Sequence, residues 1–282
     1  MNVINKLNKR REYDVYKPFT YTEMVRKSYS SGSICGGVLA GKTVLVTGAT
    51  GGIGVALAQR FLTESTTVYL AGRNEEKLVS LCDKLGDIYK KDCINYIIIN
   101  NLDIDDMRKK IAKLFQTTKI DFLINNSGIY TDVDKKRELR NINKEQFSLD
   151  WETNYVATKE MTYITANYMS KMGGGHIINV SSICAESPKY KYTPYGISKS
   201  AIMGLKSEIE NKYEGVSVTS ILPGTVATRM NNASFGDNIT MSRNRVFRAA
   251  LPEEIAAIVA WTCSIKDILI SSNITASACE VL

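Results

Sequence analysis

The segment of residues 42–60, KTVLVTGATGGIGVALAQR, constrains the fold more than any other part of the chain. It begins with an apolar run at residues 44–46 that is typical of a buried strand, and it ends with apolar residues at helical spacing. A glycine-rich turn separates the two. Glycine lets the backbone turn sharply and approach a ligand closely, and the first N–H groups of a helix attract a pyrophosphate. Strand, glycine turn and helix in this order therefore predict a phosphate-binding corner.

After this corner, predicted strands and helices alternate along the chain. Strands are predicted at residues 44–46, 68–70, 96–99, 120–124, 177–180 and 216–222, with a short final strand at 268–270. Helices are predicted at residues 53–62, 75–85, 107–115, 144–172, 193–213 and 252–263. This alternation predicts an α/β fold, a Rossmann-type doubly wound parallel sheet in a single three-layer domain. Ligands of such sheets bind at the carboxyl ends of the strands.

The net charge of +7 is concentrated at the N-terminus. Residues 1–40 hold seven Lys or Arg against three acids, whereas the body of the chain is close to neutral. We therefore predict no nucleic-acid groove. Residues 1–40 form a basic arm that precedes a Rossmann-type domain at residues 41–282. The arm is interpreted as flexible or loosely packed; the alternative is that it packs on the domain or a partner subunit through Tyr13, Tyr16, Phe19 and Tyr21.

The six cysteines and the single histidine have no metal-ligand spacing, so neither a metal site nor a disulfide framework is expected. Free thiols suit a reducing cytoplasm, which is the predicted location. No apolar run approaches the length of a membrane span, and the N-terminus lacks the apolar core of a secretory signal, so no membrane association is expected.

A tyrosine and a lysine four residues apart share one helix face. A nearby ammonium lowers the pKa of a phenol from about 10, which lets the tyrosine exchange a proton with a substrate oxygen. Three pairs have this spacing: Tyr13/Lys17, Tyr155/Lys159 and Tyr195/Lys199. Only the third opens a helix directly after a predicted strand, with Ser182 at the end of that strand. The other two are interpreted as coincidence.

These features resemble the short-chain dehydrogenase/reductase family, in its single-domain subtype, over about residues 40–270. Residues 47–54 match the family pattern TGxxxGxG, residues 125–128 match NNAG with Ser127 in place of Ala, and residues 223–228 match PGxVxT. Four residues fall at the positions of the family's catalytic tetrad: Asn154, Ser182, Tyr195 and Lys199.

The resemblance implies a role for each member of the tetrad. Tyr195 is the general acid/base, and Lys199 lowers its pKa and holds the nicotinamide ribose. Ser182 positions and polarises the substrate oxygen. Asn154 holds a water that links Lys199 to solvent in a proton relay. The cofactor supplies the hydride, and no metal is needed.

Cofactor choice depends on the end of the second strand, where an acid would favour NAD(H). Here that acid is absent and Arg73 is suitably placed to pair with a 2′-phosphate, so NADP(H) is favoured over NAD(H). The alternative is that Arg73 is a surface residue in an enzyme of mixed specificity. Asp103 is expected to contact the adenine, to cap the next helix, or both. The full predicted cofactor set is Gly48, Thr50, Gly51, Gly52, Ile53, Gly54, Arg73, Asp103, Asn126, Ser127, Gly128, Tyr195, Lys199, Pro223, Gly224, Val226 and Thr228.

The sequence thus predicts an NADP(H)-dependent oxidoreductase that interconverts a carbonyl and a secondary alcohol of a small molecule. The alternative is a catalytically idle dinucleotide-binding or regulatory protein on the same scaffold. The basic residues of the segment 229–250 suit either a polar or anionic substrate or a solvated lid. A homodimer is expected; a tetramer is less favoured, since the C-terminus lacks the glycine-rich finish common among tetrameric relatives.

Overall fold

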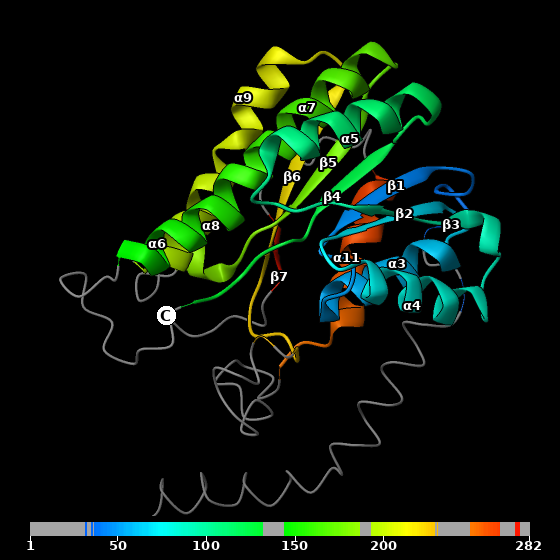
Figure 1. The fold of residues 1–282 in the computed structure, drawn as a ribbon, viewed down its shortest axis with the longest axis horizontal. Coiled ribbons are helices and arrows are strands. Elements are labelled where there is room, and N and C mark those ends of the chain that lie inside the picture. The colour runs from blue at the N-terminus through cyan, green and yellow to red at the C-terminus, as the bar shows by residue number, and fades with distance from the viewer. Residues whose placement is uncertain are drawn as a thin grey trace, which may run out of the picture.

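The structure, a computed structural model, describes residues 32, 35, 37–131, 144–186, 193–228, 230, 249–265 and 274–276. A seven-stranded sheet forms its centre in the order β3-β2-β1-β4-β5-β6-β7, and every neighbouring pair of strands is parallel (Figure 1). The strands are β1 Thr43–Thr47, β2 Thr67–Gly72, β3 Ile94–Ile98, β4 Phe122–Asn125, β5 Gly175–Val180, β6 Val216–Pro223 and β7 Ile274–Ala276.

Helices cover both faces of the sheet, which makes three layers (Figure 1). One face carries α3 Gly52–Thr63, α4 Glu75–Gly86 and α11 Pro252–Ser264, and a hydrophobic core centred on Leu57 and Phe61 lies beneath them. The opposite face carries α5 Ile104–Thr117, α7 Ala157–Lys171 and α9 Leu205–Lys212, over a second core that contains Met107 and Met161. The predicted doubly wound parallel sheet is confirmed.

The strand order reverses between β1 and β4, because β1 pairs with β2 on one side and with β4 on the other. At such a switch point the connections leave toward opposite faces and open a crevice at the carboxyl ends of the strands. The glycine turn between β1 and α3 lies at that edge.

Several element boundaries differ from the sequence predictions. The predicted helix 144–172 is three pieces, α6 Lys144–Asp150, a π-helical turn at Trp151–Val156, and α7. The predicted helix 193–213 divides into α8 Pro194–Met203 and α9 at Gly204, a residue of low helix propensity whose N–H bonds to Ala201 three residues back.

Several predicted strands were displaced. The third and fifth strands begin two residues earlier than predicted, at Ile94 and Gly175, and the fourth begins two residues later, at Phe122. The predicted strand 268–270 lies outside the described residues, and the seventh strand, Ile274–Ala276, was not predicted. A three-residue strand carries too little alternation to be recognised, and its position depends on pairing with β6.

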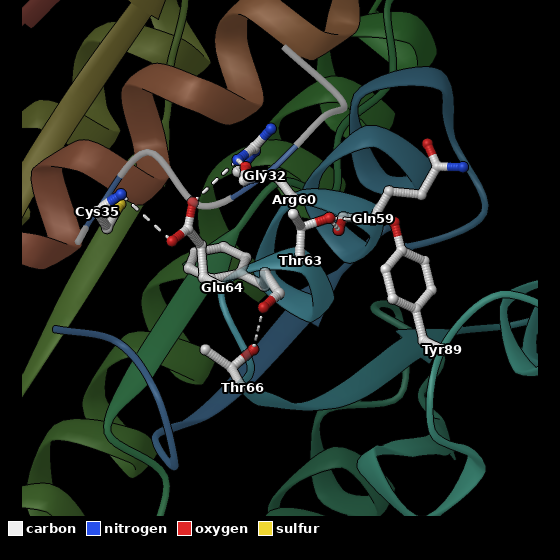
Figure 2. Close-up of polar contacts among 9 residues, drawn as sticks. Gly32, Cys35, Gln59, Arg60, Thr63, Glu64, Thr66 and Tyr89 are labelled. Carbon is white, nitrogen blue, oxygen red and sulfur yellow. Dashed lines mark hydrogen bonds and ion pairs between the residues drawn. The ribbon is translucent and has the colours of Figure 1, made fainter. Parts of the chain in front are cut away.

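Gly32 and Cys35 are attached to the domain by a buried ion pair at the C-terminal end of α3 (Figure 2). Arg60 Nη1 donates to Glu64 Oε1 and to Gly32 O, both at 2.9 Å, and the N–H of Cys35 donates to Glu64 Oε2 at 3.3 Å. Cys35 and Leu39 are buried in the core under α3 and α11. The boundary predicted after residue 40 thus falls within a segment that packs on the domain. Tyr13, Tyr16, Phe19 and Tyr21 lie outside the described residues.

Among the helices that the structure describes, none combines the length and the apolar character that crossing a membrane requires.

Candidate active site

The glycine turn after β1 has the tight geometry that a phosphate-binding corner needs. Gly48 has a φ of +63°, and a Cβ at this position would lie 2.9 Å from Ser127 Cα. A Cβ on Gly54 would collide with the carbonyl oxygen of Gly48. Helix α3 begins after Gly51 without a side-chain cap, so no side chain occupies the N–H groups of its first turn. The turn thus presents bare backbone donors at a helix N-terminus.

A hydroxyl group ties the end of β1 to the end of β4. Thr47 Oγ1 accepts from the N–H groups of Asn126 and Ser127, both at 3.0 Å. Asn126 Nδ2 donates back to the carbonyl oxygens of Thr47 and Gly48 at 3.1 and 3.2 Å. The side chain of Asn126, predicted to bind the cofactor, here holds the glycine turn in place.

The segment 223–228 reaches the same corner from β6. A Cβ on Gly52 would lie 2.8 Å from Thr228 Cγ2, so this side chain covers the start of α3. Val226 forms a bridge with Ala250, which fixes the segment to the chain that leads into α11. Pro223 is the last residue of β6, and Gly224 follows it.

Tyr195 and Lys199 come to the carboxyl end of β5 on helix α8. Thr193 caps this helix by accepting from the N–H of Gly196 at 3.0 Å, and Pro194 occupies its first turn. Lys199 Nζ donates to the carbonyl oxygen of Val180, the last residue of β5, at 3.0 Å. It lies 5.7 Å from the centre of the Tyr195 ring.

Ser182 and Asn154 complete the group. The Ser182 hydroxyl hydrogen-bonds the Tyr195 side chain. Asn154 lies in the π-helical turn, and its Nδ2 donates to Ser198 Oγ on α8 at 3.2 Å. A Cβ on Gly128 would be 3.1 Å from Lys199 Nζ and 3.2 Å from Asn154 Oδ1. Glycine at 128 therefore lets the lysine and the asparagine approach the same point.

The protonation of the pair differs from the expectation that Lys199 lowers the pKa of Tyr195. Burial raises the pKa of Tyr195 well above its usual value, and the charges of Cys184 and Asp150 raise it further, against the hydrogen bond from Ser182. Burial also lowers the pKa of Lys199 to about 8, against the opposing effect of Asp150. A low-dielectric environment disfavours the charged form of both groups, and burial is the largest cause of each shift. At neutral pH the phenol is protonated.

The two residues predicted at the adenosine end are exposed. Arg73 follows β2 and makes no hydrogen bond or ion pair with the described part of the chain. Asp103 caps α5 by accepting from the N–H of Asp106 at 3.0 Å, so the predicted capping role is confirmed. Neither residue is held away from solvent, and both are accessible to a ligand.

The two rejected Tyr-x-x-x-Lys pairs lie elsewhere. The ring of Tyr155 packs at 4.5 Å from that of Trp151, and Lys159 Nζ lies over the ring of Tyr163. Tyr13 and Lys17 lie outside the described residues, as do all four basic residues of the segment 229–250.

Sequence reasoning missed two residues at this site. Tyr130 packs edge-on against Tyr195, with ring centres 5.1 Å apart and an interplanar angle of 88°. Asp150, the last residue of α6, is fully buried and acts electrostatically on both Tyr195 and Lys199. The available signals were the position of Tyr130 just beyond residues 125–128, and the spacing of Asp150 four residues before Asn154.

Comparisons with known proteins found a matching family model and similar proteins. A family model described as short chain dehydrogenase matches residues 42–238. A 7α-hydroxysteroid dehydrogenase of Paraclostridium sordellii is 30% identical over 251 residues, which cover 86% of this chain and 91% of that protein.

Solved structures of similar fold include ElxO with NADP bound and a 3-oxoacyl-[acyl-carrier protein] reductase of Brucella melitensis with bound NAD. ElxO has a TM-score of 0.74 at 23% identity and covers 84% of this chain and 97% of its own. The reductase has a TM-score of 0.71 at 23% identity and covers 84% of this chain and 89% of its own.

Proposed function

Because the chain belongs to the short-chain dehydrogenase family, we propose that it is an oxidoreductase that interconverts a carbonyl and a secondary alcohol, with Tyr195 as the general acid/base. The observation that carries this proposal is the convergence of Tyr195, Ser182 and Lys199 at the end of β5. A phenol, a hydroxyl and an ammonium at one point suit proton exchange with a substrate oxygen.

Each side chain of this group has a distinct role in the proposed reaction. Ser182 donates to the substrate oxygen and orients it, since its hydroxyl already hydrogen-bonds Tyr195. In reduction Tyr195 gives its proton to the carbonyl oxygen, and in oxidation it takes the proton of the alcohol. Lys199 stabilises the phenolate that forms, and its position depends on Val180 O. Asn154 fixes the π-helical turn to α8 and supports a proton path from Lys199 to solvent.

The residues of the glycine turn fit a nicotinamide dinucleotide. The uncapped start of α3 offers N–H groups to a pyrophosphate, and the positions of Gly48 and Gly54 exclude any side chain there. A bound nicotinamide would supply or accept the hydride of the reaction. The expected contacts are the set given by the sequence, with Asn126 acting through the turn rather than by its amide nitrogen.

We favour NADP(H) because Arg73 follows β2 with its guanidinium exposed and without a carboxylate partner among the described residues. A guanidinium pairs well with a 2′-phosphate. The solved structures of similar fold hold NADP in one case and NAD in the other, so the preference rests on Arg73.

A homodimer in the cytoplasm remains our expectation, which size-exclusion chromatography and fractionation of cells would test.

The test is a screen of ketones and secondary alcohols, including 3-oxoacyl thioesters and oxosteroids, followed by NADPH absorbance at 340 nm. We expect turnover by the wild-type protein and a loss of about 10³-fold in Tyr195→Phe. Equal rates in the two proteins on every substrate would contradict the assignment of Tyr195. Binding of NADPH without turnover of any substrate would favour the idle dinucleotide-binding protein.

A further inference from the structure

Ser181 is a buried serine between Val180 and Ser182, and the mechanism above assigns it no role. It follows the last residue of β5 and is 4% exposed. Its hydroxyl donates to the backbone carbonyl oxygen of Lys199 on α8 at 2.8 Å, in a buried hydrogen bond. A buried hydroxyl needs a hydrogen-bond partner, and here the partner belongs to the lysine of the site. The bond therefore joins the end of the sheet to the helix that carries Tyr195 and Lys199.

The position of Ser181 is itself fixed by the sheet. Its N–H donates to the carbonyl oxygen of Ile221 on β6 at 2.8 Å. Val180, the residue before it, pairs in register with the same Ile221, which is fully buried. The hydroxyl of Ser181 therefore starts from a point where two paired strands hold the backbone. A hydrogen bond from such a point limits where the carbonyl oxygen of Lys199 can lie.

Two successive residues at the end of β5 thus hold the two ends of Lys199. Val180 O accepts from Nζ at 3.0 Å, and Ser181 Oγ donates to the backbone carbonyl at 2.8 Å. The lysine side chain is a flexible four-carbon stem, so an ammonium whose backbone could shift would not keep one position. With both ends held, Nζ lies 5.7 Å from the centre of the Tyr195 ring. A displacement of the Lys199 backbone would move the ammonium relative to the phenol.

Other serines of α8 hold different parts of the helix. Ser198 Oγ donates to the carbonyl oxygen of Tyr195 within the same helix. Ser200 Oγ donates to the carbonyl oxygen of Ala185, in the turn after β5, at 2.6 Å. The Ser200 bond attaches the helix next to Lys199 without involving the lysine itself. It therefore offers a matched comparison, because it is the same kind of bond one residue further along.

We propose that Ser181 is a positioning residue whose hydroxyl holds the backbone of Lys199 at the end of β5, so that the ammonium remains beside Tyr195. The proposal rests on the proposed function, since it concerns the lysine that would hold the nicotinamide ribose and support proton transfer by Tyr195. The loss of the hydroxyl should therefore weaken the cofactor contact and slow turnover by way of Lys199.

The experiment titrates each protein with NADPH at pH 7 and follows the fluorescence of the cofactor, which needs no substrate. In Ser181→Ala the Kd should rise about fivefold, the effect of losing one ordinary hydrogen bond. Ser181→Thr keeps the hydroxyl and should bind NADPH as the wild type does. Ser200→Ala removes the comparison bond and should leave the Kd unchanged.

A double substitution tests whether Ser181 acts through Lys199. When two residues act through one contact, their effects do not add. Ser181→Ala should therefore leave the Kd of Lys199→Met where it is, whereas a general loosening of the fold would add the same factor again. On the substrate found in the screen, kcat of Ser181→Ala should fall about tenfold with little change in the KM of the substrate, because the misplaced ammonium serves the proton transfer.

An unchanged Kd in Ser181→Ala would overturn the proposal. An equal rise in Ser200→Ala, or a double variant in which the two effects add fully, would also overturn it. If circular dichroism shows that Ser181→Ala does not fold, Ser181→Cys takes its place, because a thiol is only a weak donor. Wild-type affinity in Ser181→Cys would then overturn the proposal.

The two proposals fail in different ways. An inactive Tyr195→Phe together with an unchanged Kd in Ser181→Ala would remove the role of Ser181 alone. Wild-type turnover by Tyr195→Phe would remove the proposed role of Tyr195, whereas a raised Kd in Ser181→Ala would still support the link between Ser181 and Lys199. A wild-type protein that binds neither NADPH nor NADH would overturn both.

Discussion

Two clusters of buried charge differ in how their charges are partnered, one just before β2 and the other at the carboxyl end of β5. In the first, Arg60 and Glu64 lie one turn apart at the end of α3, in contact at 2.9 Å, and they bind the backbone of residues 32 and 35 (Figure 2). In the second, Lys199 donates to a neutral carbonyl, and Asp150 acts on it from another helix. A contact pair holds both charges in place. In the second arrangement burial lowers the pKa of Lys199 to about 8, which suits the proton transfer that we propose for this site.

Among the substitutions that distinguish the two clusters, Lys199→Met is expected to have the largest effect on turnover. Turnover should fall by about 10⁴-fold, because both the proton supply and the ribose contact are lost. The free energy of unfolding should stay the same or rise, since a well-packed apolar side chain replaces a buried charge. Initial rates and urea unfolding measure the two quantities on one sample. A loss of stability that matched the loss of activity would show that Lys199 also holds the fold.

The reverse pattern is expected for Arg60→Met. Glu64 would keep its buried carboxylate without the guanidinium, which costs about 4 kcal/mol of unfolding free energy, while kcat of the remaining folded protein should be unchanged. Arg108→Met is the matched control, because Arg108 pairs with Glu160 at the surface and should cost less than about 1 kcal/mol.

The double variant Arg60→Met/Glu64→Leu sharpens this prediction. Replacing both charges should recover much of the stability, unless the contacts with the backbone at residues 32 and 35 matter more than the pair itself. A double variant as unstable as Arg60→Met would show that these backbone contacts dominate.

Arg73 belongs to neither buried cluster. Its substitution therefore tests the contribution of an exposed charged side chain. Arg73→Ala should leave stability unchanged, because the side chain is exposed. The ratio of kcat/KM for NADPH over NADH should fall about 30-fold, the equivalent of about 2 kcal/mol for a charge-assisted hydrogen bond. Lys77→Ala, another exposed cation near the start of α4, serves as the control. An unchanged ratio in Arg73→Ala would contradict the preference for NADP(H).

The smallest effect is expected from Ser198→Ala. The hydroxyl links Asn154 Nδ2 to the carbonyl oxygen of Tyr195, so its removal should cost about 1 kcal/mol of unfolding free energy. Turnover should fall several-fold, because the π-helical turn and α8 lose a shared contact. Ser207→Ala, an exposed serine on α9, should change neither quantity. A purely structural role would leave turnover unaffected.

Local patterns predicted the fold and much of the site. The glycine turn, the alternation of strands and helices and the spacing of Tyr195 and Lys199 are all short-range features, and the structure has the turn and the pair where the sequence implied. The break at Gly204 coincides with a residue of low helix propensity that the helical pattern did not weigh. The π-helical turn at Asn154 accompanies a tertiary contact, in which Asn154 accepts from the N–H of Ile129. The catalytic roles and the NADP(H) contacts stay predictions.

Burial accounts for what the sequence could not reveal. Arg60 and Glu64 have the spacing of an ordinary surface pair, yet both side chains are buried, and the backbone of Gly32 and Cys35 contacts them. In the same way, burial is the largest cause of the raised pKa of Tyr195, although Lys199 Nζ lies 5.7 Å from its ring centre. Neither effect is encoded in the spacing of the residues concerned.

The contacts of Gly32 and Cys35 can form early while the chain is being synthesised. The contacts of Gly32 with Arg60 and of Cys35 with Glu64 span only 28 and 29 residues, whereas α11, which packs on the same core, begins at Pro252. At about 5–20 residues per second, translation leaves on the order of ten seconds or more between the emergence of α3 and that of α11. During this interval the early segment can already shield part of the apolar face of α3, a face on which a nascent chain would otherwise aggregate.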